Sequence, residues 1–561
     1  MSSFFAIPSA QKKRKRTEDS QISKKRVASK PSRVEKPAPR KPQRDESISG
    51  SDDDSNGEEF GGFDDEEGSQ GSSSGGDDGE EETAAERRLR LAERYLDNVR
   101  TEVNVDSHGF DAEEIDRELI AERLQEDVAE SKGRMYRHLA SQLEFGGASH
   151  SWFKSNAESI TGIASCAPYA YTVSKDLWLV KWRIQDLPKD QWLPKKGKKN
   201  KKPPPPPKRR PERVLSVRGD KKKSKDNSYQ GHTDIILTVA CSEDGKLVVT
   251  GGKDRKIIVW DASTLKPLRV FTQHRDSVTG LAFRRGTNQL YSSSKDRTVK
   301  VWSLDELAYV ETLFGHQDEV VDIAALAQER CISVGARDRT ARLWKVAEET
   351  QLVYRGGGGS KSKGKTMEGS MDRVAMIDDE MFVTGGDNGS ICLWTIHKKK
   401  PIHTVSAAHG VEEQMASDEA SAEVEEGKRA VPEPQVRWIT CLSTVPYSDV
   451  VLSGSWDGFL RAWKISSDKK KLESMGVVGS LDGHGALHVN GTPLTNGDTE
   501  HHEGSIAKGV MNDISLFERG DRGKDGLCVV VAVGKEHRLG AWKKVHGKNG
   551  AVVFEIPRME T

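Results

Sequence analysis

The strongest constraint on the fold of this chain is a repeat in its middle. Three segments, 231–262, 273–304 and 315–346, align with one another residue by residue. Each carries a histidine, an aspartate and a tryptophan at the same places: His232, His274 and His316; Asp254, Asp296 and Asp338; Trp260, Trp302 and Trp344. Each marker recurs every 42 residues. An interval kept by three residue types indicates one structural unit repeated along the chain.

Each unit reads as four short strands. In the first unit the runs 235–240, 246–252, 256–260 and 267–271 are rich in β-branched residues and are separated by turn residues. Four strands in a period of about 40 residues make one blade of a β-propeller. The histidine and the aspartate lie in turns, where we expect them to form buried hydrogen bonds, and the tryptophan ends the third strand and packs between sheets.

Weaker copies extend the repeat in both directions. Three keep an aspartate before a tryptophan, and the last has Glu536 in the place of the aspartate: Asp176 and Trp182, Asp387 and Trp394, Asp457 and Trp463, Glu536 and Trp542. The predicted fold is therefore all-β, a seven-bladed WD-repeat β-propeller over residues 150–558. Residues 213–217 would complete the first blade and 551–556 the last. Two ways of closing the ring stay open, end to end or with an added strand near Trp152 and Phe153.

Composition divides the rest of the chain. Residues 1–82 are first basic and then acidic, which predicts a disordered charged tail. Residues 83–146 have apolar positions three and four apart, which predicts an N-terminal helical extension that packs on the propeller or on a partner. Low-complexity insertions are expected near residues 185–212, 355–370, 407–434 and 470–505.

Nothing in the sequence indicates an enzyme. Residues 359–366 match the phosphate-loop pattern GxxxxGK[ST], but the sequence after them reads as strand where that loop needs a helix, so we interpret them as a linker. The six cysteines are far apart and lie in apolar runs, which predicts neither a metal site nor disulfides. We expect no cofactor, no metal and no membrane segment, and an intracellular protein.

Basic residues cluster around the predicted turns on one face. Cations flank the repeat aspartates or precede inner strands, and one tryptophan accompanies them: Lys253, Lys295, Arg337, Arg373, Arg437 and Trp438. Cations for phosphates together with an aromatic ring for base stacking are the combination by which proteins bind RNA. The sequence thus predicts an RNA-binding or partner-binding face.

Two further segments carry a family resemblance. With the propeller pattern, AERLQEDVAESKGR (121–134) and GKEHRLGAW (534–542) resemble the WD-repeat subunits of the U3 small nucleolar ribonucleoprotein. The resemblance implies a non-catalytic subunit that binds the box B/C region of U3 snoRNA beside the small kink-turn-binding protein. It also implies other box C/D core proteins and small-subunit processome factors as partners, a role in 18S rRNA maturation, a nucleolar location in the nucleus and a monomer within the particle. Glu536, His537 and Arg538 match the family's last-blade turn, which implies a contact surface.

A second class of function stays open. A WD-repeat adaptor that reads peptides, as in chromatin or ubiquitin-ligase scaffolds, would share the fold and need no RNA. The kind of molecule recovered with the protein distinguishes the two.

Overall fold

The structure is a computed structural model, and it describes residues 124, 128, 135–154, 157–188, 191, 208–226, 228–356, 369–414, 431, 433–479, 506–520 and 523–559. All of these lie in the second of the two compact units of the chain, Arg87–Thr561. The predicted tail, the phosphate-loop-like segment 359–366 and most of the predicted helices lie outside the described residues. Leu124 and Val128 are helical.

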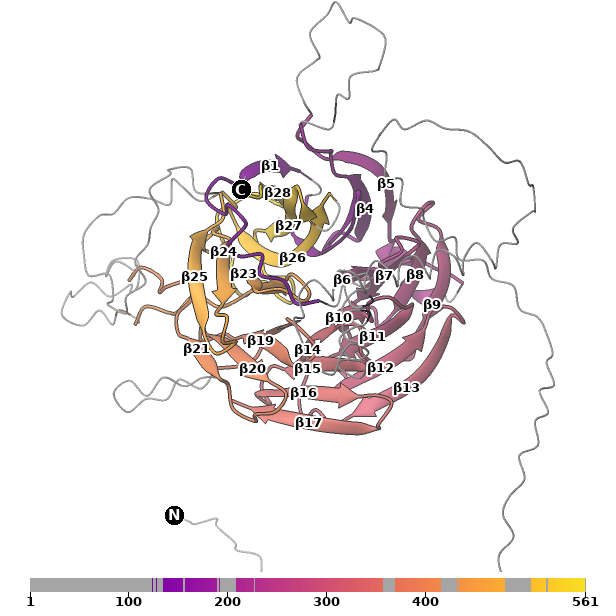
Figure 1. The fold of residues 1–561 in the computed structure, drawn as a ribbon. Helices are drawn as coiled ribbons and strands as arrows, with labels where there is room; N and C mark the ends of the chain where they lie inside the picture. Colours follow the sequence, from indigo (N-terminus) through magenta and orange to yellow (C-terminus); the bar gives the residue numbers. More distant parts are fainter. Residues whose placement is uncertain are drawn as a thin grey trace, which may run out of the picture. The chain divides into compact units, whose positions relative to one another are not determined.

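The strands form seven four-stranded antiparallel sheets arranged in a ring, which confirms the predicted seven-bladed propeller (Figure 1). Residues of the inner strands line a central channel. Successive β-branched and aromatic side chains of a strand point to opposite faces of its sheet. Each face packs on a neighbouring sheet, so the strands are buried on both faces. A short 3-10 helix, Lys221–Lys225, precedes blade 2.

In blades 1 to 4 the strands run in chain order from the channel outward. The bounds are β2 Ile160–Cys166, β3 Tyr169–Ser174, β4 Trp178–Arg183 and β5 Glu212–Arg218 in blade 1; β6 Ile236–Cys241, β7 Leu247–Gly252, β8 Ile257–Asp261 and β9 Pro267–Phe271 in blade 2; β10 Val278–Phe283, β11 Gln289–Ser294, β12 Thr298–Ser303 and β13 Ala308–Phe314 in blade 3; β14 Val320–Ala325, β15 Arg330–Gly335, β16 Thr340–Lys345 and β17 Thr350–Arg355 in blade 4.

Blades 5 and 6 follow the same order, and blade 7 departs from it. The bounds are β18 Arg373–Met376, β19 Met381–Gly385, β20 Ile391–Thr395 and β21 His403–Val405 in blade 5; β22 Cys441–Thr444, β23 Val450–Gly454, β24 Arg461–Ile465 and β25 Leu472–Val477 in blade 6; β26 Val510–Arg519, β27 Gly526–Gly534, β28 Gly550–Ile556 and β1 Ser149–Phe153 in blade 7. The predicted insertion 470–505 was therefore placed too early, because its first residues form β25.

An added N-terminal strand closes the ring. β1 pairs with β28 from Ser149 opposite Glu555 to Phe153 opposite Ala551. Residues 551–556 are thus the third strand of blade 7, and their prediction as its fourth strand was wrong. Trp542 ends no strand, since it lies in the loop between β27 and β28. The inner strands β2 and β26 lie side by side at the closure.

The residues just before β1 belong to the propeller. Residues 135–146 form turns and isolated bridges, so the predicted helix does not extend through them. Arg137 bridges to Ser448 near blade 6, and Leu143 bridges to Arg558 after blade 7. Ala140, Leu143 and Phe145 are buried in one cluster with side chains of blades 6 and 7. We call residues 135–148 the strap.

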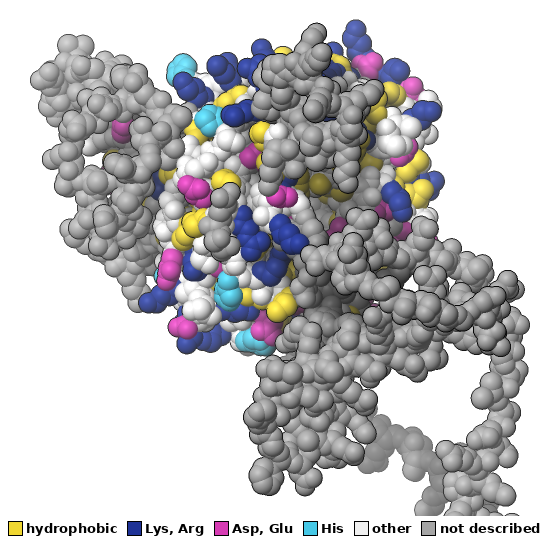
Figure 2. All heavy atoms as spheres, turned by 45° about the horizontal axis from the view of Figure 1, so that its top comes forward, with side chains coloured by type: hydrophobic (Ala, Val, Ile, Leu, Met, Phe, Trp, Pro, Cys, Tyr) yellow, Lys and Arg dark blue, Asp and Glu magenta, His cyan; other side chains and the backbone are white. Residues whose placement is uncertain are grey.

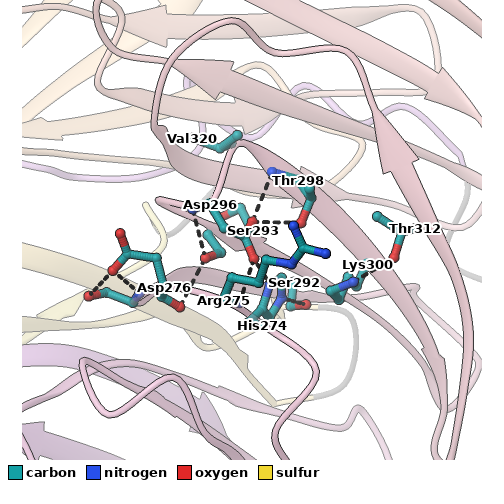
Figure 3. Close-up of polar contacts among 12 residues, drawn as sticks. His274, Arg275, Asp276, Ser292, Ser293, Asp296, Thr298, Lys300, Thr312 and Val320 are labelled. Atoms are coloured by element: carbon teal, nitrogen blue, oxygen red, sulfur yellow. Dashed lines mark hydrogen bonds and ion pairs between the residues drawn. The ribbon is translucent and has the colours of Figure 1, made fainter.

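Four of the blades contain the same side-chain hydrogen-bond network. In blade 3, the His274 Nδ1–H donates to Asp296 at 2.8 Å, and His274 Nε2 lies 2.8 Å from the Ser292 hydroxyl (Figure 3). The Trp302 Nε1–H donates to the same hydroxyl at 2.8 Å. The same networks join His232, Thr250, Asp254 and Trp260 in blade 2, and His316, Ser333, Asp338 and Trp344 in blade 4. The repeat histidines, aspartates and tryptophans thus take part in buried hydrogen bonds of the blade to which each belongs.

The fourth network was missed in the sequence. His409 donates from Nδ1 to Asp457 at 2.8 Å and contacts Ser453 Oγ at 2.8 Å, while Trp463 Nε1 donates to the same hydroxyl. Asp457 follows His409 after 48 residues, against 22 residues in the regular repeats. Because residues 407–434 were interpreted as an insertion, this buried histidine was not recognised as a marker. The insertion in fact begins after it.

Candidate nucleic-acid interface

The face on which the inner strands begin carries a cavity of about 810 Å³ at one mouth of the channel. Five lysines line this channel mouth: Lys175, Lys221, Lys253, Lys295 and Lys535. Two of them are paired with carboxylates, since Lys175 lies 2.9 Å from Glu536 and Lys295 lies 2.9 Å from Glu319. The structure thus brings together the predicted residues Lys253, Lys295 and Glu536. Arg538 lies at the bottom of the same cavity.

Two of the predicted contact arginines are buried in the channel. Arg538 is 4% exposed, and its two terminal nitrogens donate to the carbonyls of Thr279 (2.8 Å) and Val321 (2.9 Å). Arg373 is 5% exposed and donates from Nε to the carbonyl of Thr440 at 2.7 Å. These bonds join different blades, since Arg538 lies in the loop after β27 and bonds to β10 and β14, and Arg373 lies on β18 and bonds to the residue before β22. The expectation of a surface contact is therefore replaced for Arg373 and Arg538 by a structural role.

The Arg373 guanidinium also balances buried charge. It lies 3.5 Å from Asp322 and 3.8 Å from Asp513. Burial raises the pKa of the Asp513 carboxyl despite this neighbour. For Arg538, burial lowers the pKa of the guanidinium to about 10, and the positive charge of Arg373 acts in the same direction. Both guanidinium groups stay charged at neutral pH and hold the channel together.

The turn after β27 contains Glu536 and His537. Side-chain hydrogen bonding to Lys175 lowers the pKa of Glu536, and a second lysine, Lys544, lies 3.3 Å away. Burial, followed by the charges of Arg538, Arg373 and Lys175, holds the pKa of His537 well below its ordinary value. A neutral His537 and an ionised Glu536 therefore stand at neutral pH beside the channel mouth.

An aromatic cluster lies next to the channel mouth, over blades 6 and 7. It consists of Trp438, Trp456, Trp542 and His537. The ring of Trp438 lies 5.6 Å from that of Trp456 and 5.9 Å from that of Trp542, measured between centroids. Trp542 is 53% exposed, although tryptophan normally buries most of its surface. The sequence predicted only Trp438 and His537 of this cluster, because Trp542 was assigned to a strand end.

Charged side chains surround the cluster. The Lys543 ammonium lies 4.2 Å from the centre of the Trp456 ring and pairs with Glu412, to which the Trp456 Nε1–H also donates. Arg437 donates to the carbonyl of His409 at 3.2 Å, so its side chain is held beside the blade 6 network. The cluster therefore offers an exposed ring next to cations, which suits stacking on a base beside a phosphate.

The remaining predicted contact residue, Arg337, does not line the cavity at the channel mouth. Arg337 is exposed in the turn between β15 and β16. In Figure 2, Lys and Arg side chains are spread over the visible surface with acidic side chains among them. Charge by itself therefore marks no site, and the aromatic cluster is what distinguishes this part of the face.

In the part of the chain that the structure describes, three or more His, Cys, Asp or Glu side chains nowhere gather in a way that could hold a metal ion. No helix among the described residues is long and apolar enough to cross a membrane.

Comparisons with known proteins place this architecture in a family. The family model described as WD domain, G-beta repeat matches residues 223–261, 265–303, 308–345 and 433–464. Ribosomal RNA-processing protein 9 of Saccharomyces cerevisiae is 36% identical over 542 residues, covering 82% of this chain and 86% of that protein. U3 small nucleolar RNA-interacting protein 2 of Homo sapiens is 34% identical over 478 residues, covering 84% and 82%. The chain belongs to the WD-repeat U3 snoRNP proteins.

Solved structures agree with this family membership. A structure of U3-55K covers 72% of this chain and 98% of its own, with 29% identity and a TM-score of 0.54. A crystal structure of RRP9 WD40 repeats covers 74% of this chain and 100% of its own, also with 29% identity and a TM-score of 0.54. The family resemblance inferred from the sequence is confirmed.

Proposed function

We propose that this protein is a non-catalytic RNA-binding and protein-binding subunit of the U3 box C/D snoRNP. It binds the box B/C region of U3 snoRNA beside the kink-turn-binding protein and acts in the small-subunit processome, in the nucleolus, toward 18S rRNA. Other box C/D core proteins are further partners, and the protein is a monomer within the particle. Membership in a family whose relatives are named for U3 snoRNA interaction and ribosomal RNA processing supports this proposal.

The observation that carries the proposal is the aromatic cluster beside the lysine-lined channel mouth. Gly540 and Ala541 line the channel mouth, and Trp542 follows them directly. A nucleotide stacked on Trp542 would thus have Lys535 and Lys543 within the same loop for its phosphates. Binding through backbone phosphates and stacked bases needs no catalytic group, in keeping with a scaffold. A peptide-reading adaptor has no comparable observation in its favour.

The test is recovery of RNA from cells that carry Trp542→Ala. We expect ultraviolet crosslinking and immunoprecipitation of the unchanged full chain to recover U3 snoRNA as the dominant RNA. Loss of one stacked base should reduce recovery by about tenfold, since base stacking on an aromatic ring contributes roughly 1–3 kcal/mol. Leu268→Ala is the matched control, because Leu268 is exposed to a similar degree on the outer strand β9.

Raising the salt concentration should weaken the association steeply, as for binding through phosphates. Recovery of scattered messenger RNAs, or of no RNA, would contradict the proposed function. Equal recovery with Trp542→Ala and with the unchanged chain would remove the aromatic cluster as the contact.

A further inference from the structure

A second pocket lies on the same face, between blades 3 and 4. It has a volume of about 420 Å³, and its lining includes Arg275, Arg297, Lys300 and Phe314. Figure 3 shows the Arg275 side chain extending past Thr298 toward Lys300. Three cations and an aromatic ring thus surround one small cavity. The proposal made for this cavity rests on the RNA-binding function proposed above.

The positive charge in this pocket is not balanced by ion pairs. Among the described residues, neither Arg275 nor Arg297 pairs with a carboxylate. Lys295, two residues before Arg297, does pair with one, Glu319. The one carboxylate in the pocket, Asp296, accepts bonds from His274, from the Arg275 backbone N–H and from Thr298. Its oxygens are therefore occupied within the turn. The cavity favours an anion.

The repeat itself supplies the comparison that shows what is particular to this pocket. At the position of Arg275, one residue after the repeat histidine, the neighbouring blades have the uncharged Thr233 and Gln317. At the position of Phe314, two residues before the next repeat histidine, the chain has the polar Thr272 after blade 2 and Gln230 after blade 1. Arg275 and Phe314 therefore do not follow from the needs of a blade.

The exposure of Phe314 points to a flat ligand group. Its side chain is 71% exposed, the largest value among the exposed large hydrophobic residues of the described chain. A phenylalanine left in water gains nothing for the fold, because apolar area stabilises a protein only when it is buried. Beside two unpaired arginines, it offers a face for a base whose phosphate the arginines bind.

The pocket also continues the surface already described. Lys295 lines the channel mouth, and Arg297 lines the pocket from the same turn between β11 and β12. We propose that the cavity at Arg275, Arg297 and Phe314 binds one nucleotide of a single-stranded RNA segment, with the phosphate between the arginines and the base against Phe314. The strand would cross the channel mouth from the aromatic cluster.

Arg275 and Phe314 are the residues to change. Arg297 has a φ of +68°, a value that residues other than glycine, asparagine and aspartate rarely adopt. A substitution there would therefore also alter the turn. Lys300 donates to Thr312 at 2.6 Å and is largely buried. Arg275, by contrast, is exposed, and only its backbone N–H takes part in the Asp296 turn, which a new side chain leaves intact.

The experiment uses the full chain and a thiouridine-containing oligouridylate of about ten nucleotides, a length typical of single-strand sites. Photocrosslinking followed by mass spectrometry should place nucleotides both on the peptide with Phe314 and on the peptide with Trp542. Arg275→Glu should reduce the Phe314 crosslink by about tenfold and leave the Trp542 crosslink in place. Phe314→Ala should weaken oligonucleotide binding by roughly fivefold to tenfold. Arg269→Glu, at an exposed position on β9, is the matched charge control.

Each result decides a separate question. A Phe314 crosslink that Arg275→Glu leaves unchanged overturns the nucleotide pocket. So does crosslinking at Trp542 alone, although that result supports the proposed function. Crosslinking nowhere on the propeller overturns the nucleotide pocket, while the proposed function is decided by the recovery of U3 snoRNA from cells. Binding of a phosphoserine peptide, displaced by Arg275→Glu in a chain that gives no Phe314 crosslink, would assign the pocket to a phosphopeptide and overturn the RNA proposal.

Discussion

The residues of the last-blade turn stabilise the ring as well as forming part of its surface. Arg538 starts in blade 7 and bonds to carbonyls of blades 3 and 4 across the channel, and Arg373 joins blade 5 to blade 6. A carboxylate in place of Arg538 would lose these bonds and stand near Asp322 and Asp513. Charge reversal at this position should therefore unfold the propeller, so that a loss of RNA binding in such a variant would say nothing about contact.

His537 makes stability depend on pH. Its Nδ1 accepts the Leu539 N–H at 3.3 Å, and burial beside Arg538 and Arg373 keeps its pKa low in the folded state. Burial also lowers the pKa of His274. An unfolded histidine titrates near about 6.5, so below that pH the unfolded chain binds more protons than the folded one. The histidine contribution to stability is complete above this pH and is lost as the pH falls.

We expect the free energy of unfolding in urea to decrease between about pH 7 and about pH 5.5, by up to about 1.4 kcal/mol per pH unit for each such histidine. His537→Gln should flatten this dependence, because glutamine does not titrate. The exposed His546→Gln is the matched control. An acid dependence as steep in His537→Gln as in the unchanged chain would exclude His537 as its source.

At the scale of the strands and turns, the hydrogen-bond networks fix the turns that face the channel mouth. In blade 2, burial opposes ionisation of Asp254, but the charge and hydrogen bond of His232 and the N–H groups of Thr233 and Lys256 outweigh it, and the pKa of Asp254 is lowered. The turns that present Lys253 and Lys295 to the channel mouth are held in this way. The buried hydrogen bonds of these turns thus determine where the two lysines lie.

We expect the His409 network to fix the turns of blade 6, as the corresponding networks do in blades 2 to 4. His409→Ala leaves the Asp457 carboxylate, which is nearly inaccessible, without its main partner, so we expect a loss of about 2–4 kcal/mol of unfolding free energy. His397→Ala, at an exposed position near β20, should stay within about 0.5 kcal/mol. Chemical denaturation of the two variants gives the comparison. Equal stability of both would mean that the His409 network does not stabilise blade 6.

For the whole molecule, the strap and β1 close the ring. The strap is held by backbone N–H groups of Leu139 and Ala140 that donate to the buried Asp449, at 2.7 and 2.9 Å, and by an ion pair between Arg137 and Glu518. β1 then covers the edge of β28. An unpaired edge strand with apolar faces promotes aggregation.

A chain that starts at residue 135 should therefore remain a soluble monomer with a single thermal transition. A chain that starts at residue 155 loses the strap and β1 and should aggregate or unfold at a lower temperature, since Leu143 and Phe145 no longer fill the cluster of blades 6 and 7. Size-exclusion chromatography and calorimetry compare the two. Equal melting temperatures would show that blade 7 needs only three strands.

The regular part of the repeat could be predicted because its constraints are local. The histidine, aspartate and tryptophan of blades 2 to 4 keep fixed intervals, and the blade number followed from these repeats together with the four weaker copies. The fourth network was missed because the histidine lies 48 residues before its aspartate, which hides a contact that exists only in space. Trp542 was misassigned because its place in the repeat is that of a tryptophan that ends a strand. In the structure it lies in the loop between β27 and β28.

The sequence by itself determined the seven blades, the buried networks of the regular repeats and the family, because period and local motif suffice for these. Only the tertiary structure decided which strand closes the ring, which arginines cross the channel and which tryptophan stands exposed. These features depend on contacts between residues hundreds of positions apart, as in the bonds from Arg538 to the carbonyls of Thr279 and Val321. No pattern along the chain records such contacts, because they form when the ring closes.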